Sequence, residues 1–255
     1  MLTKRHAAIL SLLEGQGTLS LALLAGGLGV SAETVRRDVR TLVEAGAVVR
    51  VHGAVGLAGQ TGEAPFDRRM RENGAAKRAI ARAMATQIAD GDSLMLDTGT
   101  TTSFLARELV RHRRLTVVTN SSDIARTLAT VNGNRVFMAG GELRGDSGAA
   151  LGVSAIDFIR SFSVEYAIIS AGAVDASGIM DFDLHEAEFA RTVLTCGRRR
   201  IVVTDASKFG RRGVIRVTGC AGIDALVTNA APPDAVARAL ADAGVQVTLA
   251  GEVQG

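Results

Sequence analysis

From Ala75 onward, apolar residues at helical spacing alternate with short apolar runs, and this alternation constrains the fold more than any other feature. Helices are expected over residues 75–88, 102–111, 124–131, 186–195 and 234–243, between strands at residues 93–97, 115–119, 135–139, 166–171, 201–204, 225–228 and 245–249. Strands joined through helices pair in parallel and are covered by helices on both faces. The pattern therefore predicts an α/β domain over residues 75–255.

Residues 1–57 show a different pattern, in which short helices precede a hairpin. Helices are expected over residues 4–14 and 19–25, and a third begins after Ser31, which is a suitable N-cap. Gly46 stops this third helix, and the alternation over residues 48–55 predicts a hairpin, or wing. We therefore expect a separate small domain at residues 1–57.

Residues 58–74 separate these two patterns. They are poor in large apolar residues and contain several glycines and Pro65, a composition that is typical of a linker. Phe66 and the neighbouring Arg68 and Arg69 suggest that part of this linker docks against another element.

The third helix of the small domain carries arginines on one face. Arg36, Arg37 and Arg40 lie opposite the apolar stripe of the same helix. A helix presented in this way, after a short helix and a turn, is how a helix-turn-helix enters the major groove of DNA. The expected DNA contacts are Ser31, Thr34, Arg36, Arg37 and Arg40 in the helix, with Arg50 and His52 in the wing. The alternative is a solvated arginine face, which leaves the cap, the turn and the basic wing unexplained.

Small and polar residues follow several of the expected strands. Free N–H groups and the helix dipole attract phosphate where a helix begins, and ligands of open α/β sheets bind outside the carboxyl ends of strands. Such positions hold Asp97, Gly99, Thr100, Thr101 and Thr102, then Asn120 and Ser121, then Gly140 and Gly141, and finally the loop from Asp205 to Lys208. Together they predict a pocket for a small polar anion, with Lys208 as its cation. Taken alone, the first cluster is explained equally well as a turn with a threonine cap.

Carboxylates near this pocket leave two chemistries open. Asp97, Asp183 and Glu186 are expected to hold hydroxyl groups of a sugar or polyol, because a phosphate would repel them. A sugar-phosphate isomerase would instead use such a carboxylate as a base, with a lysine close by. The scattered histidines and the distant Cys196 and Cys220 show no metal-ligand spacing, so no metal site is expected.

The composition is typical of a folded protein of the cytoplasm. Hydrophobic residues make up 47% of the chain and charged residues 22%, which excludes a disordered chain. No apolar run is long enough to span a membrane, the first residues show no signal core, and both cysteines are expected to be free thiols. The net charge of +3 is small, so a nucleic-acid partner requires a local basic face.

These motifs resemble those of the DeoR family of bacterial transcriptional repressors, nearly from end to end. The N-terminal resemblance lies in Val30-Ser31, Thr34-Val35-Arg36-Arg37-Asp38-Val39, Leu42, Gly46 and His52-Gly53. The C-terminal resemblance lies in Lys77, Asp97-x-Gly99-Thr100-Thr101, Thr119-Asn120, Gly140-Gly141, Gly152, Gly172 and Asp205-x-Ser207-Lys208-Phe209-Gly210. The resemblance implies an N-terminal winged helix-turn-helix and a C-terminal effector domain, similar in fold to ribose-5-phosphate isomerase and coenzyme A transferases. It adds Gly172 to the expected effector site, and it implies that this domain senses a phosphorylated metabolite without converting it.

Within the family, four further stretches resemble members that regulate glycerol 3-phosphate metabolism. They are Leu143-Arg144, Ile156-Asp157-Phe158-Ile159, Asp181-Phe182-Asp183-x-His185-Glu186 and Lys208-Phe209-Gly210-Arg211. The resemblance implies a repressor, not an enzyme, that binds double-stranded operator DNA as a homodimer or tetramer, uses no cofactor, has no membrane partner and is released by sn-glycerol 3-phosphate. A repressor that responds to another sugar phosphate, such as a ketohexose or tagatose phosphate, and an isomerase-type enzyme are the alternatives.

Overall fold

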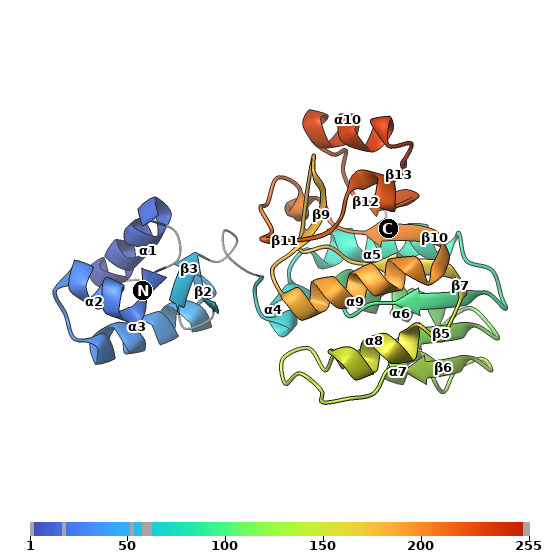
Figure 1. Ribbon diagram of the computed structural model, residues 1–255, viewed down its shortest axis with the longest axis horizontal. Coiled ribbons are helices and arrows are strands. Elements are labelled where there is room, and N and C mark those ends of the chain that lie inside the picture. The colour runs from blue at the N-terminus through green and yellow to red at the C-terminus, as the bar shows by residue number, and fades with distance from the viewer. Residues whose placement is uncertain (1–2, 17–18, 52–53, 58–62, 252–255) are drawn as a thin grey trace. The chain divides into compact units, whose positions relative to one another are not determined.

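The computed structural model describes residues 3–16, 19–51, 54–57 and 63–251 (Figure 1). The chain divides into two compact units, and the boundary between them falls between Ala64 and Pro65. Part of the expected linker at residues 58–74 is helical, because α4 (Phe66–Arg71) lies within it. Phe66 is buried, so α4 packs into the second unit, as the sequence suggested for this segment.

The first unit is a winged helix-turn-helix. Its elements are α1 (Lys4–Gln16), β1 (Leu19–Ser20), α2 (Leu21–Leu28), α3 (Ala32–Glu44), β2 (Val48–Val51) and β3 (Ala54–Leu57). The strands pair antiparallel in the order β1-β3-β2, with Val55 opposite both Leu19 and Arg50. The helix that the sequence analysis began at Leu19 begins two residues later, because Ser20 acts as the N-cap and accepts a hydrogen bond from the backbone N–H of Leu23 at 3.2 Å.

The second unit has the alternating pattern that the sequence predicted. Its elements are α4, α5 (Gly74–Ala85), β4 (Ser93–Leu96), α6 (Thr100–Leu109), β5 (Thr116–Thr119), α7 (Ser122–Leu128), β6 (Arg135–Met138), α8 (Val153–Ile159), β7 (Val164–Ile169), β8 (Ala173–Asp175), β9 (Gly178–Asp181), α9 (Leu184–Thr195), β10 (Gly197–Val203), β11 (Ile215–Thr218), β12 (Ala225–Thr228), α10 (Asp234–Asp242) and β13 (Gln246–Leu249). The main sheet is parallel and has the order β13-β12-β10-β7-β4-β5-β6. The α/β prediction is therefore confirmed.

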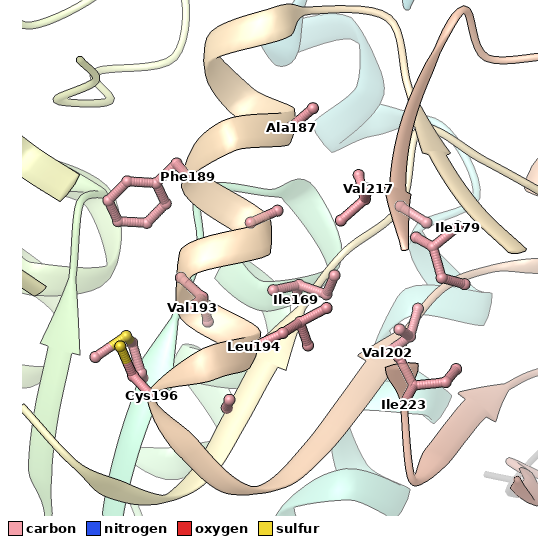
Figure 2. Packing of buried hydrophobic residues seen from close by; sticks show 14 of the residues in the cluster. Ile169, Ile179, Ala187, Phe189, Val193, Leu194, Cys196, Val202, Val217 and Ile223 are labelled. Carbon is pink, nitrogen blue, oxygen red and sulfur yellow. The ribbon is translucent and has the colours of Figure 1, made fainter. Parts of the chain in front are cut away.

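Apolar cores cover both faces of this sheet, because neighbouring strand residues point to opposite sides. Leu94 and Leu96 of β4 join the core that contains side chains of α5, α6 and α7, whereas Met95 joins the core that contains side chains of α8, α9 and α10. Figure 2 shows the second core, in which Val193 and Leu194 of α9 pack with strand side chains. The sheet is therefore the middle layer between two layers of helices.

Two features of the second unit were not predicted from the sequence. Helix α8 precedes β7, and strands β8, β9 and β11 form a small antiparallel sheet of order β11-β9-β8. These strands are short and have no helix between β8 and β9, so they leave little periodic signal.

Candidate functional site

Helix α3 folds with one apolar and one basic face. Val35, Val39 and Leu42 are fully buried in the core of the first unit. Ser31 caps the helix, since its Oγ accepts a hydrogen bond from the backbone N–H of Thr34 at 3.2 Å. The predicted N-cap is confirmed and fixes where α3 begins, whereas the buried apolar residues fix which side of the helix faces outward.

The arginines of α3 lie on its exposed face. Arg36 forms an ion pair with Glu33, and Arg40 Nε lies 3.0 Å from Glu44 Oε1. Arg37 is exposed and has no ion pair with any residue that the structure describes. Exposed pairs of this kind contribute less than about 1 kcal/mol, so a phosphate can replace the glutamates at little cost.

The remaining expected DNA contacts are placed unevenly. Thr34 is half-buried beside Ser31, with 2.9 Å between the two hydroxyl oxygens. Arg50 is exposed on β2. His52 lies outside the described residues. The structure therefore places four of the expected contacts on α3, with Ser31 as its N-cap, and puts Arg50 on the first strand of the wing.

Asp38 is a positioning residue that the sequence analysis did not identify. It is buried on the inner side of α3, where Arg5 Nη2 donates to its Oδ1 at 2.9 Å and His6 Nε2 lies 3.5 Å from the same oxygen. The hydrogen bond from Arg5 holds the pKa of Asp38 below its ordinary value. These contacts tie α3 to the first turn of α1. The sequence could have indicated this role, because Asp38 directly precedes Val39 and so lies toward the apolar side of the helix.

The second group of expected residues lies at the carboxyl edge of the main sheet. The strand order reverses between β4 and β7, because the chain continues from β4 to β5 and β6 on one side and from β7 to β10, β12 and β13 on the other. Such a reversal opens a crevice at the carboxyl ends of the strands, where open α/β sheets bind their ligands. The loops with the expected effector contacts follow β10, β7, β4, β5 and β6, in the order in which these strands lie in the sheet.

Asp97 is buried at this reversal point. Its two carboxylate oxygens accept hydrogen bonds from the backbone N–H of Ser170 at 3.1 and 3.0 Å. Burial raises the pKa of Asp97 to about 8, Asp181 adds to the rise, and Arg69 opposes it. Burial thus favours the uncharged form of Asp97, which repels a phosphate less than a carboxylate does.

Helix α6 begins beside Asp97 without a side-chain cap. Gly99 is its N-cap, and a Cβ at this position would lie 2.0 Å from Ser170 Oγ, so only glycine lets the two loops approach so closely. Thr102 Oγ1 donates to the carbonyls of Asp97 and Gly99, both at 3.0 Å. Thr100 and Thr101 are buried, and their hydroxyls have no partner among the described residues. The start of α6 thus offers backbone N–H groups and two hydroxyls to an anion.

Two other expected contacts hold the loops together. Asn120 Oδ1 accepts from Thr98 Oγ1 at 2.9 Å, and Asn120 Nδ2 donates to the carbonyl of Ala150 at 3.0 Å. Ser121 is buried and caps α7 by accepting from the backbone N–H of Ile124. The side chains of both residues therefore stabilise the loops at the carboxyl edge of the sheet.

A pocket of about 410 Å³ lies on the side of the edge where α9 begins. It is lined by Glu142, Leu143, Arg144, Gly145, Leu151, Gly152 and His185. Arg144 Nη1 lies 2.8 Å from Asp183 Oδ2 and 3.8 Å from Glu186 Oε1, and Arg144 Nε lies 3.5 Å from Asp146 Oδ1. Burial opposes the charge on Asp183, but the hydrogen bonds from Arg144 and from the backbone of α9 hold its pKa below the ordinary value. Arg144 was absent from the expected site.

The remaining expected residues lie at the same edge. Gly140 and Gly141 follow β6 and are exposed. Gly172 follows β7, and a Cβ there would lie 3.1 Å from the ring of Phe182 and 3.2 Å from the backbone of Asp181. Lys208 ends the short helical turn after β10 and is half-buried. The topology therefore brings the expected residues that follow β4, β5, β6, β7 and β10 to one end of the main sheet. Asp183 and Glu186 follow β9 of the small sheet and lie beside the loop after β6 through their contacts with Arg144.

In the described ranges of the chain, histidine, cysteine, aspartate and glutamate residues form no cluster that could hold a metal ion. The helices of these ranges include none that is long and apolar enough to cross a membrane.

The fold defines a two-domain protein of the winged helix-turn-helix class, with an α/β domain as its second unit. Residues 5–61 match the DeoR-like helix-turn-helix domain, and residues 72–230 match the DeoR C terminal sensor domain. The chain belongs to the DeoR family, which confirms the resemblance found in the sequence.

Curated relatives match this chain over nearly its whole length. The glycerol-3-phosphate regulon repressor of Escherichia coli K12 is 35% identical over 248 residues, which cover 97% of this chain and 98% of the relative. The HTH-type transcriptional repressor CsqR of the same organism is 34% identical over 246 residues, which cover 96% and 94%. Among solved structures, ribose 5-phosphate isomerase from Methanocaldococcus jannaschii matches with a TM-score of 0.42 and 16% identity, over 55% of this chain and 56% of that chain.

Proposed function

We propose that this protein represses transcription by binding operator DNA through α3 and the wing, and that sn-glycerol 3-phosphate relieves the repression. The uncapped start of α6 at the reversal point of the sheet is the observation that carries the effector half of this proposal. The DNA half rests on the basic face of α3. The printed name of the 35% identical relative supports this choice of effector.

DNA recognition is assigned to the exposed face of α3. Thr34 and Arg36 lie in the first turns of the helix, which in this class of motif contact base edges in the major groove. Arg37 and Arg40 bind phosphates or guanine, and Arg50 contacts the phosphate backbone of the DNA from the wing. A single winged helix covers a short half-site, so the protein binds as a dimer or tetramer to repeated or palindromic half-sites.

Effector recognition is assigned to the carboxyl edge of the sheet. A phosphate monoester carries close to two negative charges at pH 7, so it needs several donors and a cation. The backbone of α6 with Thr100 and Thr101 supplies the donors, and Lys208 supplies the cation. Asp97, in its protonated form, and Glu186 hold hydroxyl groups of the polyol.

Relief of repression requires that the effector binds one conformation better than the other. Glycerol 3-phosphate lowers operator affinity only if it binds the DNA-free conformation more tightly, and by reciprocity the operator lowers effector affinity equally. A coupling of about 1–3 kcal/mol is typical and releases a promoter.

Thermal-shift and calorimetric titrations of the full chain test this proposal. We expect glycerol 3-phosphate to raise the melting temperature, because a ligand that binds the native state stabilises it. Glycerol and inorganic phosphate are the controls, and ribose 5-phosphate and tagatose 6-phosphate represent the alternatives. An operator selected from random DNA then serves to measure release. If another sugar phosphate raises the melting temperature more than glycerol 3-phosphate does, that sugar phosphate is the effector instead. Turnover of ribose 5-phosphate by the protein would contradict the proposal that the second unit only senses its ligand.

A further inference from the structure

The junction between α4 and α5 is hydrogen-bonded to the loop that follows β10. Asn73 lies in this junction with φ 54° and ψ 30°, a left-handed conformation that is uncommon for residues other than glycine. Its side chain does not cap α5. Instead, Asn73 Nδ2 donates to Asp205 Oδ1 at 3.1 Å and to Ser207 Oγ at 3.2 Å. The bond to Asp205 joins residues 132 positions apart in the chain.

The Asp205 carboxylate has a different environment at each of its oxygens. Oδ1 accepts from Asn73 and also from the backbone N–H of Ser207 at 3.1 Å. Oδ2 is buried and has no hydrogen-bond partner among the residues that the structure describes. A buried carboxylate oxygen without a donor is unfavourable, and the hydroxyl of a polyol is a donor of suitable size. The same short turn ends at Lys208, the proposed cation for the phosphate.

Helix α4 also lies near the carboxyl edge of the sheet, as the interaction of Arg69 with Asp97 indicates. Arg69 of α4 is close enough to Asp97 to lower its pKa against the effect of burial. The buried Lys77 Nζ donates to the carbonyls of Arg69 and Glu72, at 2.9 Å for Glu72, and so holds the end of α4 on α5. Figure 1 shows α4 at the same end of the sensor domain as the start of α9. The end of α4 is thus held to α5 by Lys77, and the junction between these helices is linked to the turn after β10 by Asn73.

We propose that Asn73 transmits effector binding to the DNA-binding unit, by coupling the Asp205–Lys208 turn to the start of the chain segment that leads to that unit. A hydroxyl of a polyol phosphate donates to Asp205 Oδ2 while Lys208 binds the phosphate, and the turn changes shape. Asn73 then changes the angle between α4 and α5. Helix α4 is the first helix after the DNA-binding unit along the chain, so this change reaches the segment that leads to the unit. This inference rests on the proposed function and names its route of regulation.

The test is a thermodynamic cycle on the full chain, with Asn73→Gly as the variant. Glycine accepts the left-handed conformation, so the substitution removes the amide and leaves the backbone unstrained. The coupling factor is the ratio of the operator Kd with saturating glycerol 3-phosphate to the operator Kd without it, typically about 5–150-fold. We expect Asn73→Gly to reduce this factor to less than about one third of its wild-type value. The affinity of the DNA-free protein for glycerol 3-phosphate, measured by calorimetry, should stay within about threefold.

The matched control is Asn132→Gly. Asn132 is also exposed, has a φ of 52°, and donates from Nδ2 to the carbonyl of Val110 at 2.7 Å, outside the loops of the carboxyl edge. This variant should keep the full coupling factor. A wild-type factor in Asn73→Gly would overturn the inference while the proposed function stands. If glycerol 3-phosphate neither binds the wild type nor releases its operator, the proposed effector is wrong, and the cycle is measured with the sugar phosphate that gives the largest thermal shift.

Discussion

The recognition helix α3 and the carboxyl edge around β4 and β7 both carry functional side chains, but they hold them differently. On α3, the exposed Arg36 and Arg40 pair with glutamates three and four positions away. At the edge, the buried Asp97 is hydrogen-bonded to Ser170, 73 positions away. Contacts on α3 can therefore change without unfolding the protein, whereas contacts at the edge hold strands together. Function and stability are separable on α3 and coupled at the edge.

The largest effect is expected for Asp97 and depends on pH. The unfolded chain releases the Asp97 proton near its ordinary pKa of 3.8, whereas the folded protein keeps it up to about pH 8. The free energy of unfolding therefore falls as pH rises between these values, by roughly 6 kcal/mol at about 1.4 kcal/mol per pKa unit. Asp97→Asn should remove this part of the pH dependence and be more stable than the wild type at pH 8.

Urea unfolding at pH 5, 6.5 and 8 measures this difference. Tyr166 is the single tyrosine of the chain, which has no tryptophan, so intrinsic fluorescence reports on the sensor unit. The control is Asp242→Asn, which removes an exposed carboxylate and should keep the wild-type slope. Equal slopes for the wild type and Asp97→Asn would show that Asp97 is charged in the folded protein.

A smaller effect is expected for Asp38. This residue of α3 resembles Asp97 at the sheet edge, because its carboxylate is buried and contacts another part of the chain. Its buried carboxylate holds Arg5 and His6 of α1, so Asp38→Asn should destabilise the first unit by about 1–3 kcal/mol. Operator affinity should fall as well, because α3 loses its anchor. Thermal unfolding followed by circular dichroism, with an operator titration, measures both. If Asp38→Asn has the melting temperature of the wild type, the contacts of Asp38 do not stabilise the first unit.

The smallest effect is expected for Glu44. Glu44→Gln releases Arg40 from an exposed ion pair, which is worth less than about 1 kcal/mol. Operator affinity should rise by no more than about fivefold, with the free energy of unfolding unchanged within about 0.5 kcal/mol. Asp242→Asn, which changes the net charge equally in the sensor unit, is the control in a fluorescence-anisotropy titration. A loss of stability in Glu44→Gln would show that function and stability are coupled on α3 too.

The same contrast explains how far the sequence predicts the fold. Buried strands and amphipathic helices are local patterns, so the parallel sheet, the cap at Ser31 and the arginine face were predicted correctly. The small sheet of β8, β9 and β11 was missed, because its strands pair through tertiary contacts and have little periodicity of their own.

The candidate site was predictable as a region and less so residue by residue. The sequence placed polar residues at strand ends, and the sheet order shows why they meet at one edge. It could not show that Asn120 donates to the backbone carbonyl of Ala150 in a neighbouring loop. It could not show either that burial raises the pKa of Asp97, or that Arg144 pairs with Asp183. Each of these depends on chain segments brought together only by the fold.

The central claim, that α3 binds operator DNA and the sheet edge binds the effector that releases it, is tested by comparing Arg37→Ala with Lys208→Ala. Operator affinity is measured by anisotropy with and without glycerol 3-phosphate, and effector binding by calorimetry. Arg37→Ala should weaken operator binding by about 1–3 kcal/mol and bind the effector normally. Lys208→Ala should bind the operator normally and lose its response to glycerol 3-phosphate. Wild-type operator affinity in Arg37→Ala, or wild-type release in Lys208→Ala, would contradict the account.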